Sequence, residues 1–421
     1  MPRLDGLFGA VPQYLLMLRS QYWPEERMRA YVGKHLEATL DAALRIPFYR
    51  ERFGSKTQAL TDLPILARRD VPGLVASVRA MHPGGSLLAS GLTSGSTGTP
   101  VSFFFDGTHQ ASRFAARARY LRENGWNPFQ RNFWIVSTAM ETPDLIFVQR
   151  RRIFGIRFMS HLTDMEVLAD ALRKIDPVFL YSYPVNLDGL ARIFEARGDR
   201  LHSLRRIFSG SEVLEPSQRE RIRSVFGVSV SDNYGSTEAF PAWECPEGSY
   251  HINAEHVIVE VVDEAGAPAA PGTLGRVLMT TLRNRVMPLI RYEIGDYAIA
   301  ATEGRCRCGR TLPLIGAIAG RDINLFFSKS GKLFSPWPLF RPMLPRTWIT
   351  QSQIVQRALD RFVVRYVSAR ALSSEDEKEI LRHYESFLGG PVAISFERVE
   401  KIQRSRSGKF MMALNEMDLT S

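Results

Sequence analysis

Cysteine is scarce in this sequence, with only three residues in 421. Small secreted domains usually depend on many disulfides, so this scarcity excludes a disulfide scaffold and favours the reducing cytoplasm. Long hydrophobic runs are missing too, because no stretch approaches the roughly 20 apolar residues that cross a bilayer. The apolar patch at 14–18 is too short for a signal peptide and follows no basic run. We expect this patch to dock against the folded protein, and we expect no membrane span.

Acidic residues are outnumbered, 44 against 54 basic ones, which gives a net charge of +10. Such an excess favours polyanionic partners, meaning nucleic acid, an anionic membrane surface or phosphate-bearing small molecules. The basic residues are spread along the chain, with one dense run at 150–152, so no dedicated nucleic-acid stripe is evident. We therefore expect no nucleic-acid partner. The length allows two or three domains of ordinary size.

Strand-like and helical patterns alternate through the first half of the chain. Strands are predicted at 101–105, 133–137, 178–181, 206–209 and 228–231. Apolar residues at helical spacing predict helices at 24–52, 111–123, 166–174, 185–197 and 216–226. Such alternation argues for an α/β sheet that is covered on both faces.

The pattern becomes predominantly β after Ile252, with strands expected at 257–262, 275–281, 289–292 and 297–300. The last part predicts a small α+β unit, with strands at 362–369 and 392–399 around a helix at 374–388. Ser374 and Glu377 could cap that helix. We therefore expect a large N-terminal domain at 1–321, with a β-rich subdomain at about 252–321, and a small C-terminal domain at 322–421.

One short stretch, Thr93-Ser94-Gly95-Ser96-Thr97-Gly98-Thr99-Pro100, holds five hydroxyl side chains and two glycines. Glycine lets a backbone approach an anion closely, while hydroxyls and free amides supply several donors. These features favour a loop that wraps a polyphosphate. The Gly-Lys-Ser/Thr of a Walker A loop does not follow, which excludes a P-loop NTPase. An exposed Ser/Gly/Thr linker is the alternative on composition alone.

Two further loops follow predicted strands, where ligands bind in α/β sheets. The segment 233–238 combines an aromatic ring, a glycine, hydroxyls and a carboxylate. These groups could stack a base, contact a phosphate and hold Mg²⁺. The segment 209–212 could form part of the same ligand wall. A surface turn is the alternative for the first loop.

Two single residues also carry chemistry. Asp296 ends another predicted strand, where a carboxylate can accept both hydroxyls of a ribose. Lys409 follows a flexible Ser-Gly pair and can bring a compact ammonium to a developing negative charge. A solvated hairpin turn and a basic tail are the respective alternatives.

In this order and spacing, the four elements resemble the adenylate-forming (acyl-CoA synthetase) superfamily. Within it, the chain looks most like the phenylacetate–CoA ligase group and its capsule-biosynthesis, CapK-like relatives. The shared signatures are at 47–50, 63–64, 287–292 and in Cys306-x-Cys308-Gly309-Arg310. The resemblance covers essentially the whole chain. It implies an α/β fold, with a large adenylation domain and a small mobile α+β C-terminal lid domain.

The resemblance implies a role for each motif. Thr93, Ser94, Gly95, Ser96, Thr97 and Gly98 would hold the β- and γ-phosphates of ATP. Gly210, Ser211 and Glu212 would border the adenine, and Tyr234, followed by Gly235, would stack on it. Thr237 would contact the α-phosphate, Glu238 would hold Mg²⁺, and Asp296 would bind the ribose. Lys409 would bridge the substrate carboxylate and the α-phosphate, and Arg321-Asp322 would lie at the hinge between the domains.

The implied activity converts a carboxylic acid, aryl or arylacetic by resemblance, into an acyl-adenylate that passes to coenzyme A. Mg²⁺ and an ammonium relieve the repulsion between the attacking carboxylate and the phosphate. The segments 179–184 and 239–241 are candidates for the acid pocket. A carrier protein, an amine or a hydroxyl is the alternative acceptor, and a homodimer is compatible with the sequence. A basic zinc-containing nucleic-acid binder would leave Asp296 and Lys409 unexplained.

All three cysteines can be interpreted together with one histidine. Cys245, His251, Cys306 and Cys308 make a complete tetrahedral zinc set with no open position for a catalytic water. The spacing is not that of a standard finger, so free buried thiols are an alternative. A catalytic cysteine has no evident His/Asn partnership. Similarity to phenylacetate-type proteins with a comparable Cys/His set favours structural zinc.

Overall fold

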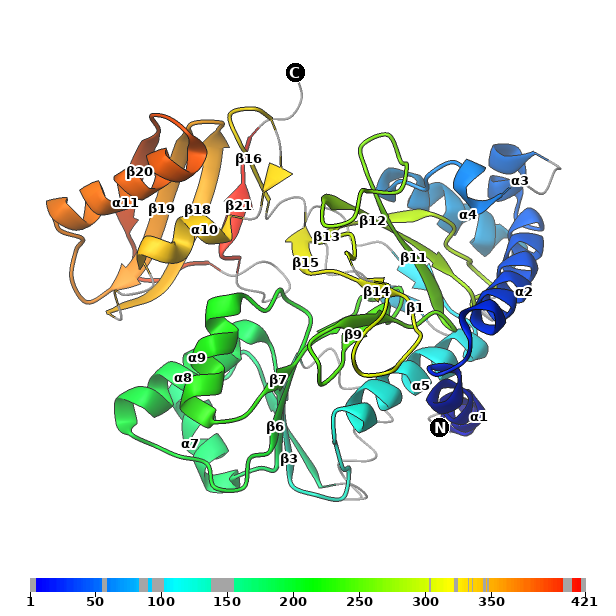
Figure 1. Ribbon diagram of the computed structural model, residues 1–421, viewed down its shortest axis with the longest axis horizontal. Helices are drawn as coiled ribbons and strands as arrows, with labels where there is room; N and C mark the ends of the chain where they lie inside the picture. Colours follow the sequence, from blue (N-terminus) through cyan, green and yellow to red (C-terminus); the bar gives the residue numbers. More distant parts are fainter. Residues whose placement is uncertain are drawn as a thin grey trace. The chain divides into compact units, whose positions relative to one another are not determined.

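The computed structural model forms two compact units (Figure 1). Within the described chain, the larger unit comprises residues from 5–92, 102–294 and 298–318, and the smaller comprises 295–297 and residues from 319–417. The expected domain boundary after residue 321 stays a prediction. The structure describes residues 5–54, 59–82, 90–92, 102–137, 155–302, 304–321, 325–331, 333–334, 336–343, 346, 348–403 and 411–417.

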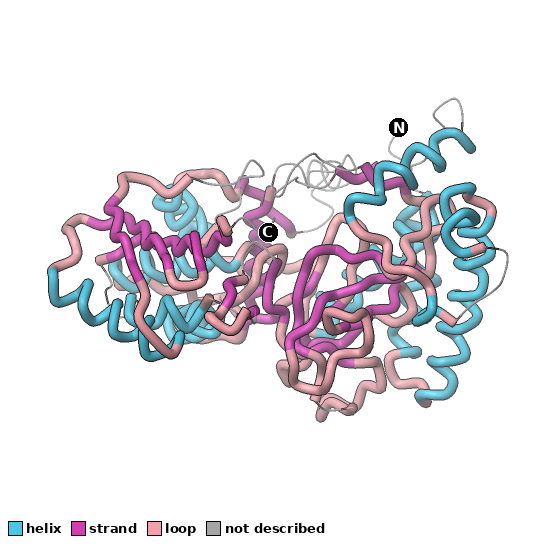
Figure 2. The backbone as a smooth tube through the Cα atoms, turned by 90° about the horizontal axis from the view of Figure 1, so that it is seen from above, coloured by secondary structure: helices cyan, strands magenta, loops and turns pink. Residues whose placement is uncertain are grey.

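The first part of the larger unit is helical, and Figure 2 shows these helices along one side of the unit, next to its antiparallel strands. The apolar patch at 14–18 lies in α1, where Met17 is fully buried, and α1 packs along α5. The helices are α1 (Asp5–Ser20), α2 (Glu25–Leu44), α3 (Pro47–Phe53), α4 (Val71–Met81) and α5 (Gly107–Glu123), with short 3₁₀ turns at Leu60–Asp62 and Arg68–Asp70.

The single helix expected at 24–52 is wrong, because the structure divides it into α2 and α3. Pro47 begins α3, and the residue before it, Ile46, is extended with φ −86° and ψ 122°. A proline lacks the N–H that would continue the earlier helix, and it disfavours helical geometry in the residue before it. The break therefore follows directly from the sequence.

The larger unit contains a five-stranded parallel sheet in the order β4-β3-β5-β6-β7. Phe133, Leu180 and Ile207 pack against α7–α9 on one face. Trp134, Tyr181 and Phe208 pack toward α5 on the other, so the expected sheet with both faces covered is confirmed. The elements are β3 (Asn132–Val136), β4 (Ile156–Ser160), α7 (Met165–Ile175), β5 (Phe179–Ser182), α8 (Pro184–Arg197), β6 (Arg206–Ser209), α9 (Pro216–Phe226) and β7 (Val230–Ser231).

Antiparallel strands make up the β-rich part. One sheet has the order β14-β10-β9-β8 and another the order β11-β12-β13-β15, while β1 pairs with β2. The strands are β1 (Ser90–Leu92), β2 (Ser102–Phe104), β8 (Asn233–Tyr234), β9 (Ala242–Glu244), β10 (Tyr250–Ile252), β11 (Val257–Val262), β12 (Leu274–Thr281), β13 (Tyr292–Ile299), β14 (Leu314–Ile315) and β15 (Ile318–Arg321).

The strand expected at 289–292 is not formed, and β13 begins only at Tyr292. Arg291 has a φ of 45°, in the left-handed region that a strand does not use. Its guanidinium donates to the carbonyl oxygens of Thr61, Leu63 and Gly266, at 2.8, 2.9 and 3.0 Å. These contacts from distant parts of the chain hold the turn.

The smaller unit is α+β, as expected, with helix α11 packed on a sheet in the order β20-β19-β18-β21. The N-cap of α11 is Ser373, paired with Asp376, and the expected cap by Ser374 and Glu377 is wrong by one residue. The elements are β16 (Phe326–Phe327), β17 (Leu333–Phe334), α10 (Trp337–Phe340), a 3₁₀ turn at Arg341–Met343, β18 (Ile349–Ala358), β19 (Arg361–Ser368), α11 (Ser374–Leu388), β20 (Ala393–Arg398) and β21 (Ala413–Asn415). Among the described residues, no helix is long and apolar enough to cross a membrane.

The carboxyl group of Glu215, at the start of α9, makes stability depend on pH. Burial raises its pKa from 4.5 to about 7. Between these values the unfolded chain ionises first, so the group lowers the free energy of unfolding progressively as the pH rises from 4.5 to 7. Glu215→Gln removes this titration. We expect the variant to gain up to about 2 kcal/mol relative to the parent between pH 5 and pH 8, measured by urea unfolding.

The matched control for this measurement is Glu220→Gln, on the same helix. Glu220 is exposed, and a hydrogen bond from Arg223 lowers its pKa, so it stays ionised over the range tested. Its effect should therefore not change with pH. An equal effect of Glu215→Gln at every pH would contradict the assignment.

Candidate functional site

Two loops that follow neighbouring strands of the parallel sheet contact each other. Asn233 Nδ2 donates to the carbonyl oxygen of Ser209, at the end of β6, and lies 3.4 Å from Tyr181 Oη. A Cβ atom on Gly210 would lie only 2.4 Å from Asn233 Nδ2, so a larger residue at position 210 would displace the Asn233 side chain. The structure thus brings the segments 209–212 and 233–238 together, at the strand ends where open α/β sheets bind ligands.

The loop at 209–212 has an unusual backbone conformation. Ser211 has a φ of 71°, in the left-handed region that few residues other than glycine adopt. Such conformations concentrate at ligand sites, where the surrounding structure holds them in place. Ser211 and Glu212 are both partly exposed, while Tyr234 in the second loop is 7% exposed.

The turn at 236–239 is held internally by Ser236. Its Oγ accepts hydrogen bonds from the backbone N–H groups of Glu238 and Ala239, at 3.2 and 3.1 Å. Its own N–H donates to the carbonyl of Ala239 at 2.9 Å. Glu238 is thereby kept on a buried turn, with only 3% of its surface exposed. A carboxylate is the hard oxygen ligand that Mg²⁺ prefers, so this side chain suits the expected metal role.

A buried group of side chains from α5 and the segment 253–257 lies next to this turn. Arg113 donates to the carbonyl oxygens of Ser236 and Thr237. His109 stacks on Phe105 with ring centroids 4.9 Å apart, and its other neighbour, His256, is at 4.8 Å. Burial lowers the pKa of His109 to about 3, so this imidazole is neutral at physiological pH. None of these residues belongs to a sequence motif, so nothing in the sequence predicted them as part of the site.

The candidate acid pocket at 179–184 is buried throughout. Phe179 packs against Phe208, with centroids 6.1 Å apart, in the hydrophobic core. Tyr183 Oη accepts from the backbone N–H of Ser137 at 3.0 Å, and burial raises the pKa of its hydroxyl to about 12. Phe179 is therefore a core residue, whereas Tyr181 approaches the loop at 233–238 through Asn233.

In the smaller unit, the structure pairs two of the predicted site residues. Arg321 Nε donates to Asp296 Oδ1 at 3.2 Å, and Asp296 is 8% exposed. The cation orients the carboxylate. The remaining predicted residues, which are those of the loop at 93–100, Asp322 and Lys409, lie outside the described part of the chain.

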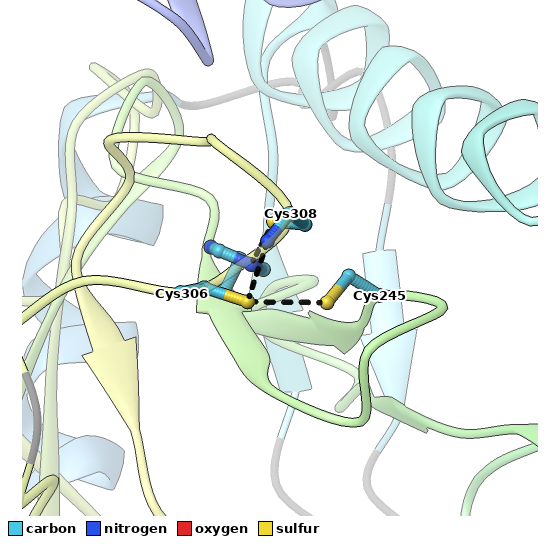
Figure 3. Close-up of side chains that lie close together, drawn as sticks. Cys245, Cys306 and Cys308 are labelled. Carbon is cyan, nitrogen blue, oxygen red and sulfur yellow. Dashed lines mark hydrogen bonds between the residues drawn. The ribbon is translucent and has the colours of Figure 1, made fainter.

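The predicted Cys/His set converges in the larger unit. The ligand atoms of Cys245, His251, Cys306 and Cys308 all lie within 4.8 Å of one another. Cys245 Sγ and Cys306 Sγ are 3.6 Å apart (Figure 3), and Cys308 Sγ lies 3.2 Å from His251 Nε2. A disulfide needs about 2.05 Å, whereas two thiolates on one tetrahedral zinc ion lie about 3.8 Å apart. The observed spacing fits zinc better than a disulfide.

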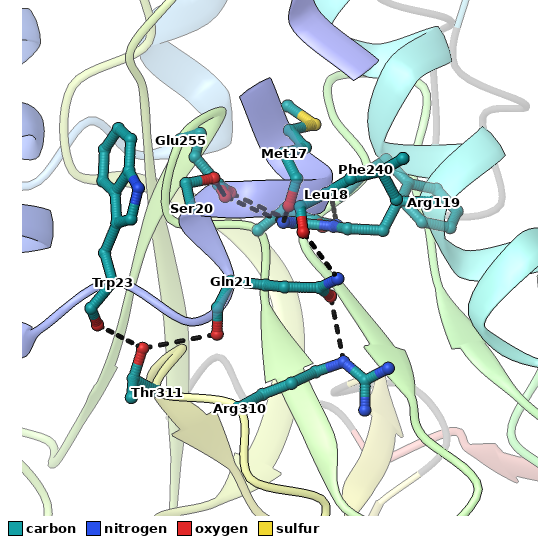
Figure 4. A network of polar contacts seen from close by, with 11 residues as sticks. Met17, Leu18, Ser20, Gln21, Trp23, Arg119, Phe240, Glu255, Arg310 and Thr311 are labelled. Atoms are coloured by element: carbon teal, nitrogen blue, oxygen red, sulfur yellow. Dashed lines mark hydrogen bonds and ion pairs between the residues drawn. The ribbon is translucent and has the colours of Figure 1, made fainter. Parts of the chain in front are cut away.

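The turn that carries Cys306 and Cys308 is anchored by the polar network in Figure 4. Arg310 Nε donates to Gln21 Oε1 at 2.9 Å, and its guanidinium also pairs with Glu123. Above it, Arg119 forms a fully buried ion pair with Glu255 and donates to the carbonyl of Met17 at 2.9 Å. These contacts fasten the end of α1 to α5 and to the cysteine-bearing turn.

Two family models match this chain. The model of the AMP-binding enzyme family matches residues 154–284, and that of the CapK C-terminal domain matches 327–416. The phenylacetate–coenzyme A ligase of Thermus thermophilus is 30% identical over 41% of this chain and 40% of its own length. Protein CapK of Staphylococcus aureus is 24% identical over 58% of this chain and 54% of its own. The chain thus spans about half the length of these curated relatives.

The fold agrees with these matches. A solved 2-hydroxyisobutyryl-CoA ligase in the postadenylation state superposes with a TM-score of 0.74. The alignment covers 94% of this chain and 93% of that one, at 18% identity. The fold is therefore that of the adenylate-forming enzymes. Residues 154–284 thus belong to the AMP-binding enzyme family and residues 327–416 to the CapK C-terminal domain family, and the curated relatives are phenylacetate–coenzyme A ligases and CapK.

Proposed function

We propose that this protein is an AMP-forming acid–thiol ligase that activates a carboxylic acid with ATP. The contact between Gly210 and Asn233 carries the proposal, because it joins two nucleotide-site motifs within the residues that the AMP-binding family model matches. In the first step a carboxylate oxygen attacks the α-phosphorus, and the bond to the β-phosphate breaks, releasing pyrophosphate. In the second step the sulfur of coenzyme A attacks the acyl carbon, AMP leaves, and the thiol proton passes to solvent.

The segments 233–238 and 209–212 would bind the nucleotide. Gly210, Ser211 and Glu212 border the adenine in this proposal, and Tyr234 stacks on it beside Gly235. The Thr237 hydroxyl donates to the α-phosphate. Glu238 would hold Mg²⁺, which would neutralise negative charge on the phosphates. The buried, internally bonded turn supports these roles, because a fixed turn positions both side chains before ATP arrives.

The loop at 93–98, Asp296 and Lys409 complete the proposed machinery. The loop residues Thr93, Ser94, Gly95, Ser96, Thr97 and Gly98 hold the β- and γ-phosphates. Asp296 accepts hydrogen bonds from the ribose hydroxyls, and its pairing with Arg321 orients the carboxylate. Lys409 neutralises charge between the carboxylate and the α-phosphate.

The proposed acid is aryl or arylacetic. Two features support this class of acid. Relatives are named as phenylacetate–coenzyme A ligases, and the aromatic side chains of Tyr181 and Phe240 lie beside the segment 233–238. Structural zinc at the Cys/His set belongs to the same proposal, supported by the spacing of the ligand atoms. A cytoplasmic location, a homodimer and a carrier-protein partner stay predictions.

Pyrophosphate release over a panel of aryl, arylacetic and short aliphatic acids, with and without coenzyme A, tests the proposal. We expect release that depends on an aryl or arylacetic acid, and a thioester product only when coenzyme A is present. A different outcome is that the acyl-adenylate accumulates in the presence of coenzyme A and is consumed only after a carrier protein or an amine is added. That result would show that the acceptor is the carrier protein or the amine and not coenzyme A. No release with any acid would contradict the ligase assignment.

A further inference from the structure

Arg113, on helix α5, forms hydrogen bonds with the backbone of the turn that carries Thr237 and Glu238. Its Nη1 donates to the carbonyl oxygen of Thr237 at 3.0 Å, and its Nη2 donates to that of Ser236 at 2.8 Å. The two consecutive carbonyls are thus bound by one planar fork. Such a fork fixes orientation as well as distance, which a lysine ammonium cannot do.

The same turn is closed from within by Ser236. Its Oγ takes the N–H groups of Glu238 and Ala239, so internal hydrogen bonds and the Arg113 fork together leave the backbone of 236–239 little freedom. Thr237 and Glu238 are carried on this fixed backbone. Catalytic geometry is sensitive to displacements of about 1 Å, so the support behind a site affects its rate.

Arg113 also brings positive charge to a buried carboxylate. Glu238 is 3% exposed, and Arg113 is a positively charged group that interacts with it electrostatically. Burial and then Arg117 lower the pKa of Arg113 to about 10, against the opposing effect of Glu238, so the guanidinium remains charged at neutral pH. The neighbouring imidazoles of His109 and His256 add no charge, because burial lowers both their pKa values.

We propose that Arg113 is a positioning residue for the adenylation step. Its two hydrogen bonds to consecutive carbonyls hold Thr237 and Glu238 in place before ATP and Mg²⁺ bind. This inference rests on the proposed function, because it assigns Arg113 to the support of residues whose roles that function supplies.

The test compares Arg113→Gln, which loses fork and charge, with Arg113→Lys, which keeps the charge. Acid-dependent ATP–pyrophosphate exchange should show kcat reduced about 100-fold in the glutamine variant and about 10-fold in the lysine variant. The KM for ATP should change less than about threefold in both, because the adenine contacts are untouched. Arg122→Gln, an exposed site on the same helix, is the control and should match the parent.

Hydrogen–deuterium exchange over 233–241 gives a second readout that does not need activity. We expect faster amide exchange in both Arg113 variants than in Arg122→Gln, with melting temperatures close to the parent. Parental amide exchange rates over 233–241, or a parental kcat in a folded Arg113→Gln, would overturn the inference. If the parent itself shows no acid-dependent exchange, the proposed function fails, and the deuterium measurement still decides whether Arg113 fixes the turn.

Discussion

Replacing Lys409 with alanine is expected to reduce acid-dependent ATP–pyrophosphate exchange by about 10²- to 10⁴-fold. The attacking carboxylate and the α-phosphate are both anions, and a compact ammonium between them lowers the energy of their approach. Thioester formation from a supplied acyl-adenylate and coenzyme A should fall less than about tenfold, because that step breaks a bond to AMP and joins no two anions. The two half-reactions, measured separately on the same preparation, make the comparison.

The control is Lys401→Ala, an exposed lysine in the same C-terminal region. It removes the same charge from the chain, so it reports any general effect of net charge on nucleotide binding. Both half-reactions should stay at the parent level in this variant. Equal losses in the two half-reactions of Lys409→Ala would contradict a role confined to adenylation, and parental exchange would remove Lys409 from the reaction altogether.

The parallel sheet could be predicted because its signals are local and periodic. Each strand, such as that around Phe133 and Ile135, is a short apolar run between helical patterns, and both faces are buried as the alternation requires. The prediction of one helix at 24–52 missed the break, although Pro47 marks it in the sequence. The turn at Arg291 could not have been predicted, since its positive φ depends on carbonyls of residues far away in the sequence.

The candidate site also has some features that could be predicted from the sequence and others that could not. Parallel strands end at one edge of a sheet, so the meeting of the loops after β6 and β7 follows from their order in the chain. The lack of space for a side chain at Gly210 could not be predicted, because it depends on where the structure places the Asn233 side chain. The role of Arg113 could not be predicted from the sequence. A single arginine on a helix is ordinarily solvated, and its two carbonyl partners lie more than a hundred residues away along the chain.

Removing one ligand of the Cys/His set should release zinc and destabilise the larger unit. We expect about one zinc ion per chain in the parent by elemental analysis, and almost none in Cys306→Ser or His251→Gln. Structural zinc contributes folding free energy directly, so the free energy of unfolding should fall by several kcal/mol. Serine is close to cysteine in size, so the loss should come from the metal and not from a cavity.

His202→Gln is the matched control, because His202 is exposed and lies far along the chain from the four ligands. It should keep both the metal and the parental stability. The polar contacts of Arg310 with Gln21 and Glu123 remain in every variant, so the cysteine-bearing turn stays attached at its base and the effect isolates the metal. Three titratable thiols in a folded parent that contains no zinc would contradict the assignment and make these residues buried free cysteines. Full stability of Cys306→Ser after zinc loss would show that the ion binds without holding the fold.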